Sequence, residues 1–270
     1  MRTKPNFNKA KTTAYKALQQ HKITDFPINL LPILKSYDDI NIISYSDMAK
    51  KRNCTLEEII EANSSEDGSI HYCPIRNKYL IAYNDSVGHE QRVYWTLAHE
   101  FGHYLLGHHK ESDRSSLARN EMSEQEYDTF EGEAHFFARF FLSPPPLIVQ
   151  TKMSHYQKVM DFFGISYTAA NKTLEYIEES CKRGFQFRLP PYISNMFDSF
   201  LNKVTNGKTC NNCNSFFYFN EATHCPICRS SDLHTFFIGD DINMKYEGYQ
   251  LNENGYPVTR PLQYMRNIYN

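Results

Sequence analysis

The sequence lacks any long apolar segment. No stretch approaches the roughly 20 consecutive apolar residues that a membrane-spanning helix requires. Residues 1–16 are polar and basic, and they contain no apolar core of the kind found in signal peptides. On this basis we expect a protein that works in the cytoplasm, away from membranes.

A strong excess of charge of one sign is also missing. The 29 Lys and Arg residues are balanced by 31 Asp and Glu residues, which leaves a net charge of −2. Proteins that bind nucleic acid through its phosphates normally carry a basic surplus. The composition therefore argues against bulk nucleic-acid binding and is that of a globular protein with roughly one to three domains.

The cysteines do not form a set that suits a disulfide framework. There are seven, an odd number, and four of them form two Cys-x-x-Cys motifs. Each motif can supply two thiolates, and four thiolates complete a tetrahedral zinc site with no position left for water. This spacing predicts a structural zinc ribbon over residues 207–238, in which metal binding drives folding. Its predicted ligands are Cys210, Cys213, Cys225 and Cys228.

One motif has the residues of a catalytic zinc site. The sequence His-Glu-Phe-Gly-His begins at His99, inside a segment whose apolar residues recur with the period of an amphipathic helix. Residues four apart project from the same side of a helix, so His99 and His103 can bind one zinc ion. Glu100 can then act as general base on a water. Gly102 lowers helix stability by about 1 kcal/mol, which is explicable if another part of the chain approaches the helix closely there.

The third zinc ligand is expected from a second helix. Ser123-x-x-Glu126 is a capping box that marks its start, apolar residues follow with helical periodicity, and the prolines after Ser143 end it. Residues 110–121, between the two predicted helices, are polar and typical of an exposed loop.

This second helix offers three candidate ligands. Its apolar stripe places Glu131 roughly 60° from the stripe centre and Glu133 roughly 100° away on the other side. A zinc ligand must face inward, so we predict that Glu131 binds the metal and that Glu133 is a solvated charge. His135 lies one turn beyond Glu131, where it could orient a ligand or replace Glu131 as the third one.

Two further histidines follow the first helix. His108 and His109 come directly after Gly107, a predicted helix C-cap. The zinc site needs neither of them as a ligand. We predict that they interact favourably with the negative end of the helix dipole.

The remaining pattern predicts an α+β fold. The predicted strands are residues 40–45, 69–73 and 78–83, and the predicted helices are residues 13–22, 26–34 and 46–62. Thr55 and Glu58 fit a capping box within the last of these helices. The strand at 78–83 leads into the first zinc-binding helix, and we expect its free edge to receive an extended peptide by β-addition.

Two stretches carry a resemblance to a known family. One is residues 96–108, Thr-Leu-Ala-His-Glu-Phe-Gly-His-Tyr-Leu-Leu-Gly-His, preceded by Ile-Ala-Tyr-Asn at 81–84; the other is residues 131–138, Glu-Gly-Glu-Ala-His-Phe-Phe-Ala, followed by Leu-Ser-Pro. In this order they resemble the ImmA/IrrE family of zinc metallopeptidases. The resemblance also implies Glu131 as a zinc ligand. His135 departs from the family pattern, which usually has Asn or Asp there.

The resemblance covers roughly residues 12–181, which include most of a predicted helix-turn-helix-like segment at residues 151–188. Helices are predicted at 156–163 and 167–179, with Ser166 as the N-cap of the second. Several Glu residues make that second helix a poor surface for phosphates, so we expect the pair to pack on the peptidase. The predicted domains are a zincin-like domain at 1–150, this segment, a linker at 189–206, the ribbon, and an aromatic tail at 239–270.

The predicted function is zinc-dependent proteolysis. Two zinc ions are expected, one catalytic and one structural, with Glu100 taking a proton from the attacking water. The resemblance implies a regulatory endopeptidase that cleaves a specific protein partner, such as a helix-turn-helix repressor, and thereby regulates transcription.

Two other functions remain open. The chain could be a non-catalytic regulator that binds a repressor or another protein through the cleft or the zinc ribbon, although Glu100 would then not be needed as a base. It could also be a nucleic-acid-binding ribbon joined to a vestigial peptidase domain, against which the balanced charge argues.

Overall fold

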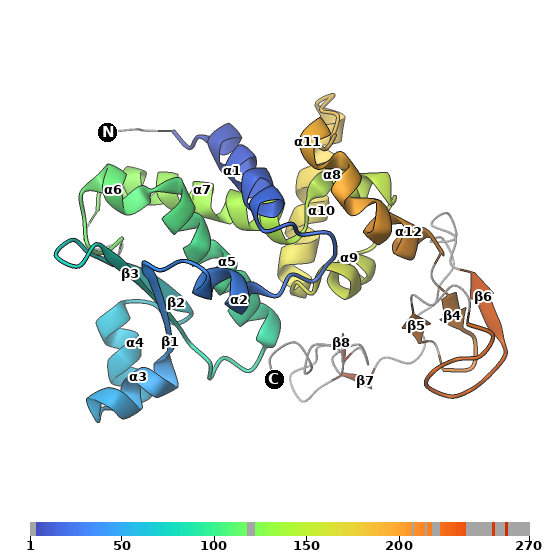
Figure 1. Cartoon of the computed structure of the whole chain (residues 1–270), viewed down its shortest axis with the longest axis horizontal. Helices are drawn as coiled ribbons and strands as arrows, with labels where there is room; N and C mark the ends of the chain where they lie inside the picture. The colour runs from blue at the N-terminus through green and yellow to red at the C-terminus, as the bar shows by residue number, and fades with distance from the viewer. Residues whose placement is uncertain are drawn as a thin grey trace. The chain divides into compact units, whose positions relative to one another are not determined.

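The computed structural model describes two compact units of the chain. Unit 1 contains residues 1–23 and 28–144, and unit 2 contains residues 24–27 and 145–270. The described residues are 4–117, 122–206, 208–213, 215–217, 222–235, 250–251 and 257–258. Figure 1 labels the helices and strands of both units. Within these ranges, no helix has the length and apolar character needed to span a membrane.

Unit 1 contains a small mixed sheet. Its strand order is β1 (Ile40–Ser44), β3 (Lys78–Tyr83), β2 (Gly68–Cys73), with β1 parallel and β2 antiparallel to β3. The three predicted strands are thus confirmed. The prediction of a free edge on β3 is wrong, because β3 is the central strand and pairs on both sides. The tight turn after β2 folds that strand back along β3, so β2 becomes an outer strand.

Strand β3 packs against helices on both faces, as the two-residue period of a strand requires. On one face, the ring of Tyr79 meets that of Tyr104 on α5 (Glu90–Leu106) edge-on, with ring centroids 4.8 Å apart. On the other face, Ala82 lies in a buried cluster with residues of two more helices. The sheet therefore fixes the position of α5, the helix with the His-Glu-x-x-His motif.

The two helices on the far face replace the single helix predicted at 46–62. They are α3 (Tyr45–Arg52) and α4 (Leu56–Asn63). Asn53 adopts a left-handed conformation, with φ of 53°, and ends α3. Thr55 then starts α4 through the predicted capping box with Glu58.

Helix α7 (Glu124–Leu142) packs along two neighbours, α5 and α1 (Phe7–Gln20). The contact with α5 is close at Gly102, where a Cβ atom would lie 2.9 Å from Cδ1 of Phe137. The expected close approach at Gly102 is therefore confirmed, and the approaching element is the helix that carries Glu131. Two short helices, α2 (Leu30–Lys35) and α6 (His108–Ser112), also belong to unit 1.

Unit 2 begins with a helical region. Its elements are α8 (Pro145–Gln150), α9 (Tyr156–Phe163), α10 (Tyr167–Lys182), α11 (Pro191–Ser194), the 3₁₀ helix η2 (Asn195–Phe197) and α12 (Asp198–Asn206). The predicted pair α9–α10 is confirmed, and the Ser166 hydroxyl accepts a hydrogen bond from the backbone of Ala169 as an N-cap. Residues 189–206, expected as a linker, carry helices because Phe197 and Phe200 pack against the ring of Phe26 in the core of this unit.

Short strands follow in unit 2. β4 (Lys208–Cys210) lies between β5 (Phe216–Phe217) and β6 (Leu233–Thr235), and β7 (Gln250–Leu251) pairs with β8 (Pro257–Val258). The predicted aromatic tail at 239–270 otherwise lies outside the described residues, as do residues 236–238 of the predicted ribbon.

Candidate active site

Helix α5 brings the two histidines and the glutamate of the motif together in the interior of unit 1. His99, Glu100 and His103 are all buried. One helical turn separates the two histidines, and their Nε2 atoms lie 3.1 Å apart. Both imidazoles therefore present a nitrogen to the same point.

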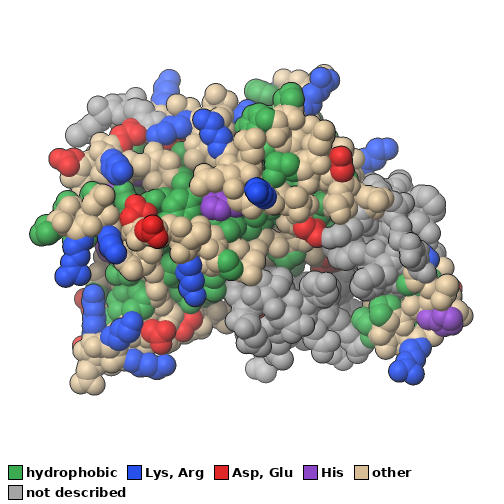
Figure 2. Space-filling view, viewed as in Figure 1, with side chains coloured by type: hydrophobic (Ala, Val, Ile, Leu, Met, Phe, Trp, Pro, Cys, Tyr) green, Lys and Arg blue, Asp and Glu red, His purple; other side chains and the backbone are tan. Residues whose placement is uncertain are grey.

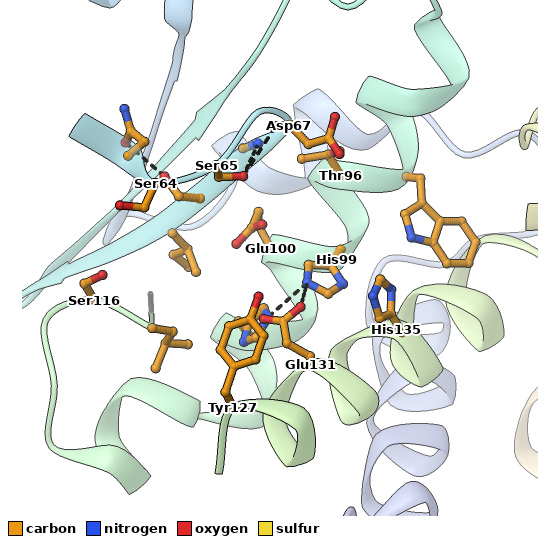
Figure 3. Close-up of a pocket in the computed structure, with 17 residues that line it drawn as sticks. Ser64, Ser65, Asp67, Thr96, His99, Glu100, Ser116, Tyr127, Glu131 and His135 are labelled. Carbon is orange, nitrogen blue, oxygen red and sulfur yellow. Dashed lines mark hydrogen bonds and ion pairs between the residues drawn. The ribbon is translucent and has the colours of Figure 1, made fainter. Parts of the chain in front are cut away.

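Helix α7 supplies a carboxylate to that point. One oxygen of Glu131 lies 3.1 Å from Nε2 of His99, and the other lies 3.3 Å from Nε2 of His103. Figure 3 shows Glu131 facing His99 across the cleft. Zinc bound at about 2.0–2.1 Å by tetrahedral nitrogen and oxygen ligands would hold them about 3.3 Å apart. The three side chains therefore fit a zinc ion.

The charges at the site suit a cation. Burial alone would raise the pKa of Glu131, but its hydrogen bonds with His103 and His99 outweigh burial and hold the pKa well below its usual range. Burial lowers the pKa of His103 to about 4, which keeps the imidazole in the neutral form that binds metals. Burial also raises the pKa of Glu100 to about 7, although a hydrogen bond from the backbone of Ile70 acts in the opposite direction.

A pocket of about 290 Å³ opens onto these residues. Its walls carry hydroxyl groups and a few large apolar side chains. The wall residues include Ser64, Ser65, Ser69, Thr96, Ser116, Trp95, Tyr127, Ile70 and Leu117. The pocket therefore offers a ligand both apolar surface and hydrogen-bonding groups next to His99, His103 and Glu131.

Strand β2 forms part of the cleft wall. Other residues of the same protein already form hydrogen bonds with part of its outer edge. The carbonyl of Ile70 accepts a hydrogen bond from Nε2 of His109 at 3.1 Å, and the backbone N–H of Tyr72 donates to the carbonyl of Ser115 at 2.8 Å. Gly68 and Ile70, which line the pocket, lie at the start of β2. An incoming peptide would therefore meet only the first part of the strand.

The prediction for His109, the second histidine after α5, is wrong. His109 is buried against the sheet, and burial lowers its pKa to about 3, so it carries no positive charge to interact with a helix dipole. His108 is also buried. Its Nδ1 lies 2.9 Å from Nδ1 of His103, and its Nε2 lies 3.1 Å from a carboxylate oxygen of Glu133.

The prediction that Glu133 is solvated is also wrong, because its side chain is fully buried. The helical-wheel argument assumed that α7 has one buried face. In the structure α7 packs on both α5 and α1, and the backbone N–H of Asn6, just before α1, donates to the Glu133 carboxylate at 2.5 Å.

His135 lies at the rim of the site. It is exposed on α7, and its ring centroid is 4.4 Å from that of His99. His99, Glu131 and His135 offer ligand atoms within 4.8 Å of one another, so a metal could also be held by that set. Glu131 contacts both imidazoles of the motif, and the set of two histidines and one glutamate is therefore complete without His135.

Trp95 and Tyr127 are cleft residues that were not predicted. Trp95 precedes His99 by one helical turn, and Tyr127 precedes Glu131 by one turn. Residues four apart on a helix share a side. The spacing alone could thus have placed the ring of Trp95 beside His99 and the ring of Tyr127 beside Glu131.

Unit 2 contains a second candidate metal centre. Cys210, Cys213, Cys225 and Cys228 place their sulfurs within 4.8 Å of one another. The sulfurs of Cys210 and Cys228 are 3.5 Å apart, and the backbone N–H of Ile227 donates to the sulfur of Cys225. Zinc bound at about 2.3 Å would hold tetrahedral sulfurs about 3.8 Å apart. The four thiols therefore fit a closed metal site.

Comparison with known proteins agrees with this geometry. No curated protein matches the sequence. Residues 58–175 match a peptidase family model, described as the IrrE N-terminal-like domain. The matched region contains α5, α7 and all of the residues that converge on the cleft. The match supports a relationship to the ImmA/IrrE family and a metallopeptidase-like role for this chain.

Proposed function

We propose that the protein is a zinc-dependent endopeptidase. The observation that carries this proposal is the convergence of His99, His103 and Glu131 on one point, beside the buried carboxylate of Glu100. Two imidazoles and one carboxylate form a common catalytic zinc set, with a position left for water or substrate. A second zinc would be held by the four thiols in unit 2 and would have a structural role.

The roles of the chain's own residues follow from their positions. When bound, zinc would polarise a peptide carbonyl and acidify a water. Glu100 would accept a proton from that water and pass it to the leaving amine. The backbone of Ile70 favours the charged form of the Glu100 carboxylate, the form that can accept a proton. Trp95 and Tyr127 would contact substrate side chains on either side of the metal.

We propose further that the substrate is a specific protein partner, such as a helix-turn-helix repressor, and that cleavage regulates transcription. The family resemblance supports this partner class. The restricted edge of β2 supports a selective enzyme, because a long extended peptide has little of the strand to pair with. On the face drawn in Figure 2, Lys and Arg side chains are mixed with Asp and Glu, which fits a protein partner better than a nucleic acid.

The test is Glu100→Gln, co-expressed with a candidate helix-turn-helix repressor. Gln is nearly isosteric with Glu but cannot accept the proton, so we expect cleavage to fall by at least about 10²–10⁴-fold while zinc and fold are kept. Mass analysis of both chains after co-expression measures the cut. Undiminished cleavage by the variant would remove Glu100 from the mechanism.

The alternative is a non-catalytic regulator that uses the same cleft for binding. One observation favours it: His109 and Ser115 already occupy backbone groups of β2 that an extended substrate would use. Tight binding of an intact repressor by the zinc-loaded parent protein would support this alternative over the enzyme.

A further inference from the structure

A chain of buried polar side chains extends from one of the proposed zinc ligands into the protein. Nδ1 of His103 lies 2.9 Å from Nδ1 of His108, and Nε2 of His108 lies 3.1 Å from Oε2 of Glu133. His108 and Glu133 are fully buried, and His103 is 2% exposed. None of the proposed catalytic steps uses His108 or Glu133.

The distances allow one consistent arrangement of protons when His103 binds a metal. Metal binding through Nε2 leaves the proton of neutral His103 on Nδ1, from which it can be donated to Nδ1 of His108. His108 then carries its own proton on Nε2 and donates it to Glu133. Each donor thus faces an acceptor, and this series of side chains ends at Glu133, whose ionised carboxylate can only accept hydrogen bonds.

Packing holds this chain of side chains in place. The ring of Phe130 stacks on that of His108, with centroids 4.5 Å apart and 14° between the planes. The second oxygen of Glu133 accepts the backbone N–H of Asn6. The carboxylate is therefore held from α1 as well as from α7, and the imidazole has little freedom to turn.

The other histidine of the motif is held differently. In the described part of the chain, Nδ1 of His99 has no hydrogen-bond partner, and the ring packs beside His135 near the cleft. The two imidazoles therefore differ. Nδ1 of His103 is linked through His108 to the buried Glu133 carboxylate, whereas Nδ1 of His99 is not.

We infer that His108 and Glu133 are positioning residues that fix the orientation and tautomer of His103 for metal binding. This inference rests on the proposed zinc site. A carboxylate behind a metal-binding histidine fixes its tautomer and raises its basicity, and loss of such a partner typically costs about 10–100-fold in metal affinity or activity. Here the carboxylate acts through a second imidazole.

The first experiment measures zinc retention. His108→Phe keeps a flat ring against Phe130 but removes both nitrogens, so we expect the active-site zinc to bind about 10–100-fold more weakly. Glu133→Gln should give a smaller loss, because an amide cannot accept both of the hydrogen bonds that the carboxylate accepts. Titration with a chromophoric chelator measures both, and the zinc held by the four thiols serves as an internal reference.

Glu126→Gln is the matched control. Glu126 is a buried acid on the same helix, and its carboxylate pairs with Arg114 at 2.8 Å. Its replacement should leave zinc affinity unchanged. Parent-like zinc affinity in both test variants would overturn the inference; if His108→Phe does not fold, Glu133→Gln alone decides.

The second experiment reads the tautomers directly. In ¹⁵N-edited spectra of the zinc-loaded parent, His103 should carry its proton on Nδ1 and His108 on Nε2. A proton on Nδ1 of His108 would overturn the inference. A parent protein that binds no zinc at the active site would instead contradict the proposed function, so the two failures can be told apart.

Discussion

At the residue scale, Glu131 joins two helices through one carboxylate. It lies on α7, yet its two oxygens contact the two imidazoles of α5 at 3.1 and 3.3 Å. Its side chain is only partly exposed, and its pKa is held low by those imidazoles. Such a group is ready to accept a cation without first losing a proton.

We therefore predict that Glu131→Gln weakens zinc binding at the active site by more than the roughly 10–100-fold expected for loss of a residue that only hydrogen-bonds to a ligand. His135→Ala should weaken it less, because Glu131 already spans both imidazoles. Zinc content after dialysis against a mild chelator measures both effects. If His135→Ala loses the metal and Glu131→Gln keeps it, His135 is the third ligand.

The sequence was sufficient to bring His99, Glu100 and His103 together, because motif spacing determines direction along a single helix, and to single out Glu131 on the second helix through the resemblance to the family pattern. It was not sufficient for Glu133, whose burial depends on α1, an element more than 110 positions away in the chain. Local periodicity contains no information on how many neighbours a helix has.

At the element scale, the approach of α5 to α7 decides whether Glu131 meets the two histidines of the motif. The two helices approach each other closely at Gly102, one residue before His103. An added Cβ would lie 2.9 Å from the ring of Phe137, which is fully buried and cannot move aside easily. The axes of α5 and α7 can therefore come this close only because Gly102 has no side chain.

We predict that Gly102→Ala destabilises unit 1 by up to about 2 kcal/mol, since overpacking of a core commonly costs about 1–3 kcal/mol and the helix-propensity gain offsets about 1 kcal/mol of that. It should also weaken zinc binding, because α7 must shift. Gly132→Ala is the control: its Cβ would meet Pro5 at 3.6 Å, an ordinary contact. Denaturant unfolding followed by the fluorescence of Trp95, the only tryptophan, measures both. A Gly102→Ala protein as stable as Gly132→Ala would contradict the packing argument.

Element types were largely predictable, but boundaries and pairing were not. The three strands of unit 1 and the pair α9–α10 match the predicted segments, because alternation and N-cap residues are local signals. Which strand lies in the centre of the sheet depends on whether β1 pairs with β2 or with β3. The apolar pattern of β3 fits a central strand and an edge strand equally well.

At the scale of the whole molecule, the two candidate metal centres belong to different units. The site of unit 1 is built from side chains that the helices already hold together, whereas the four thiols of unit 2 lie on short strands and turns. A metal in the second centre should therefore matter more for folding than a metal in the first.

We predict that the purified protein holds two zinc ions and loses them in two steps. A mild chelator should remove the active-site zinc first and leave the circular dichroism spectrum nearly unchanged, because α5 and α7 pack without it. Removal of the second zinc, closed by four thiolates, should need a stronger chelator and should unfold the ribbon. Metal analysis that finds less than one tightly held zinc would contradict the ribbon assignment.

The hydrogen bonds from His109 and Tyr72 along β2 also have a consequence for solubility. An unprotected outer strand beside an open cleft would be a template on which copies of the protein could add strand to strand and aggregate. Because the Ile70 carbonyl and the Tyr72 N–H are satisfied within the chain, β2 cannot extend the sheet into a neighbouring molecule along that stretch. The protein can thus keep an open cleft at the sheet margin while this strand is protected against self-association.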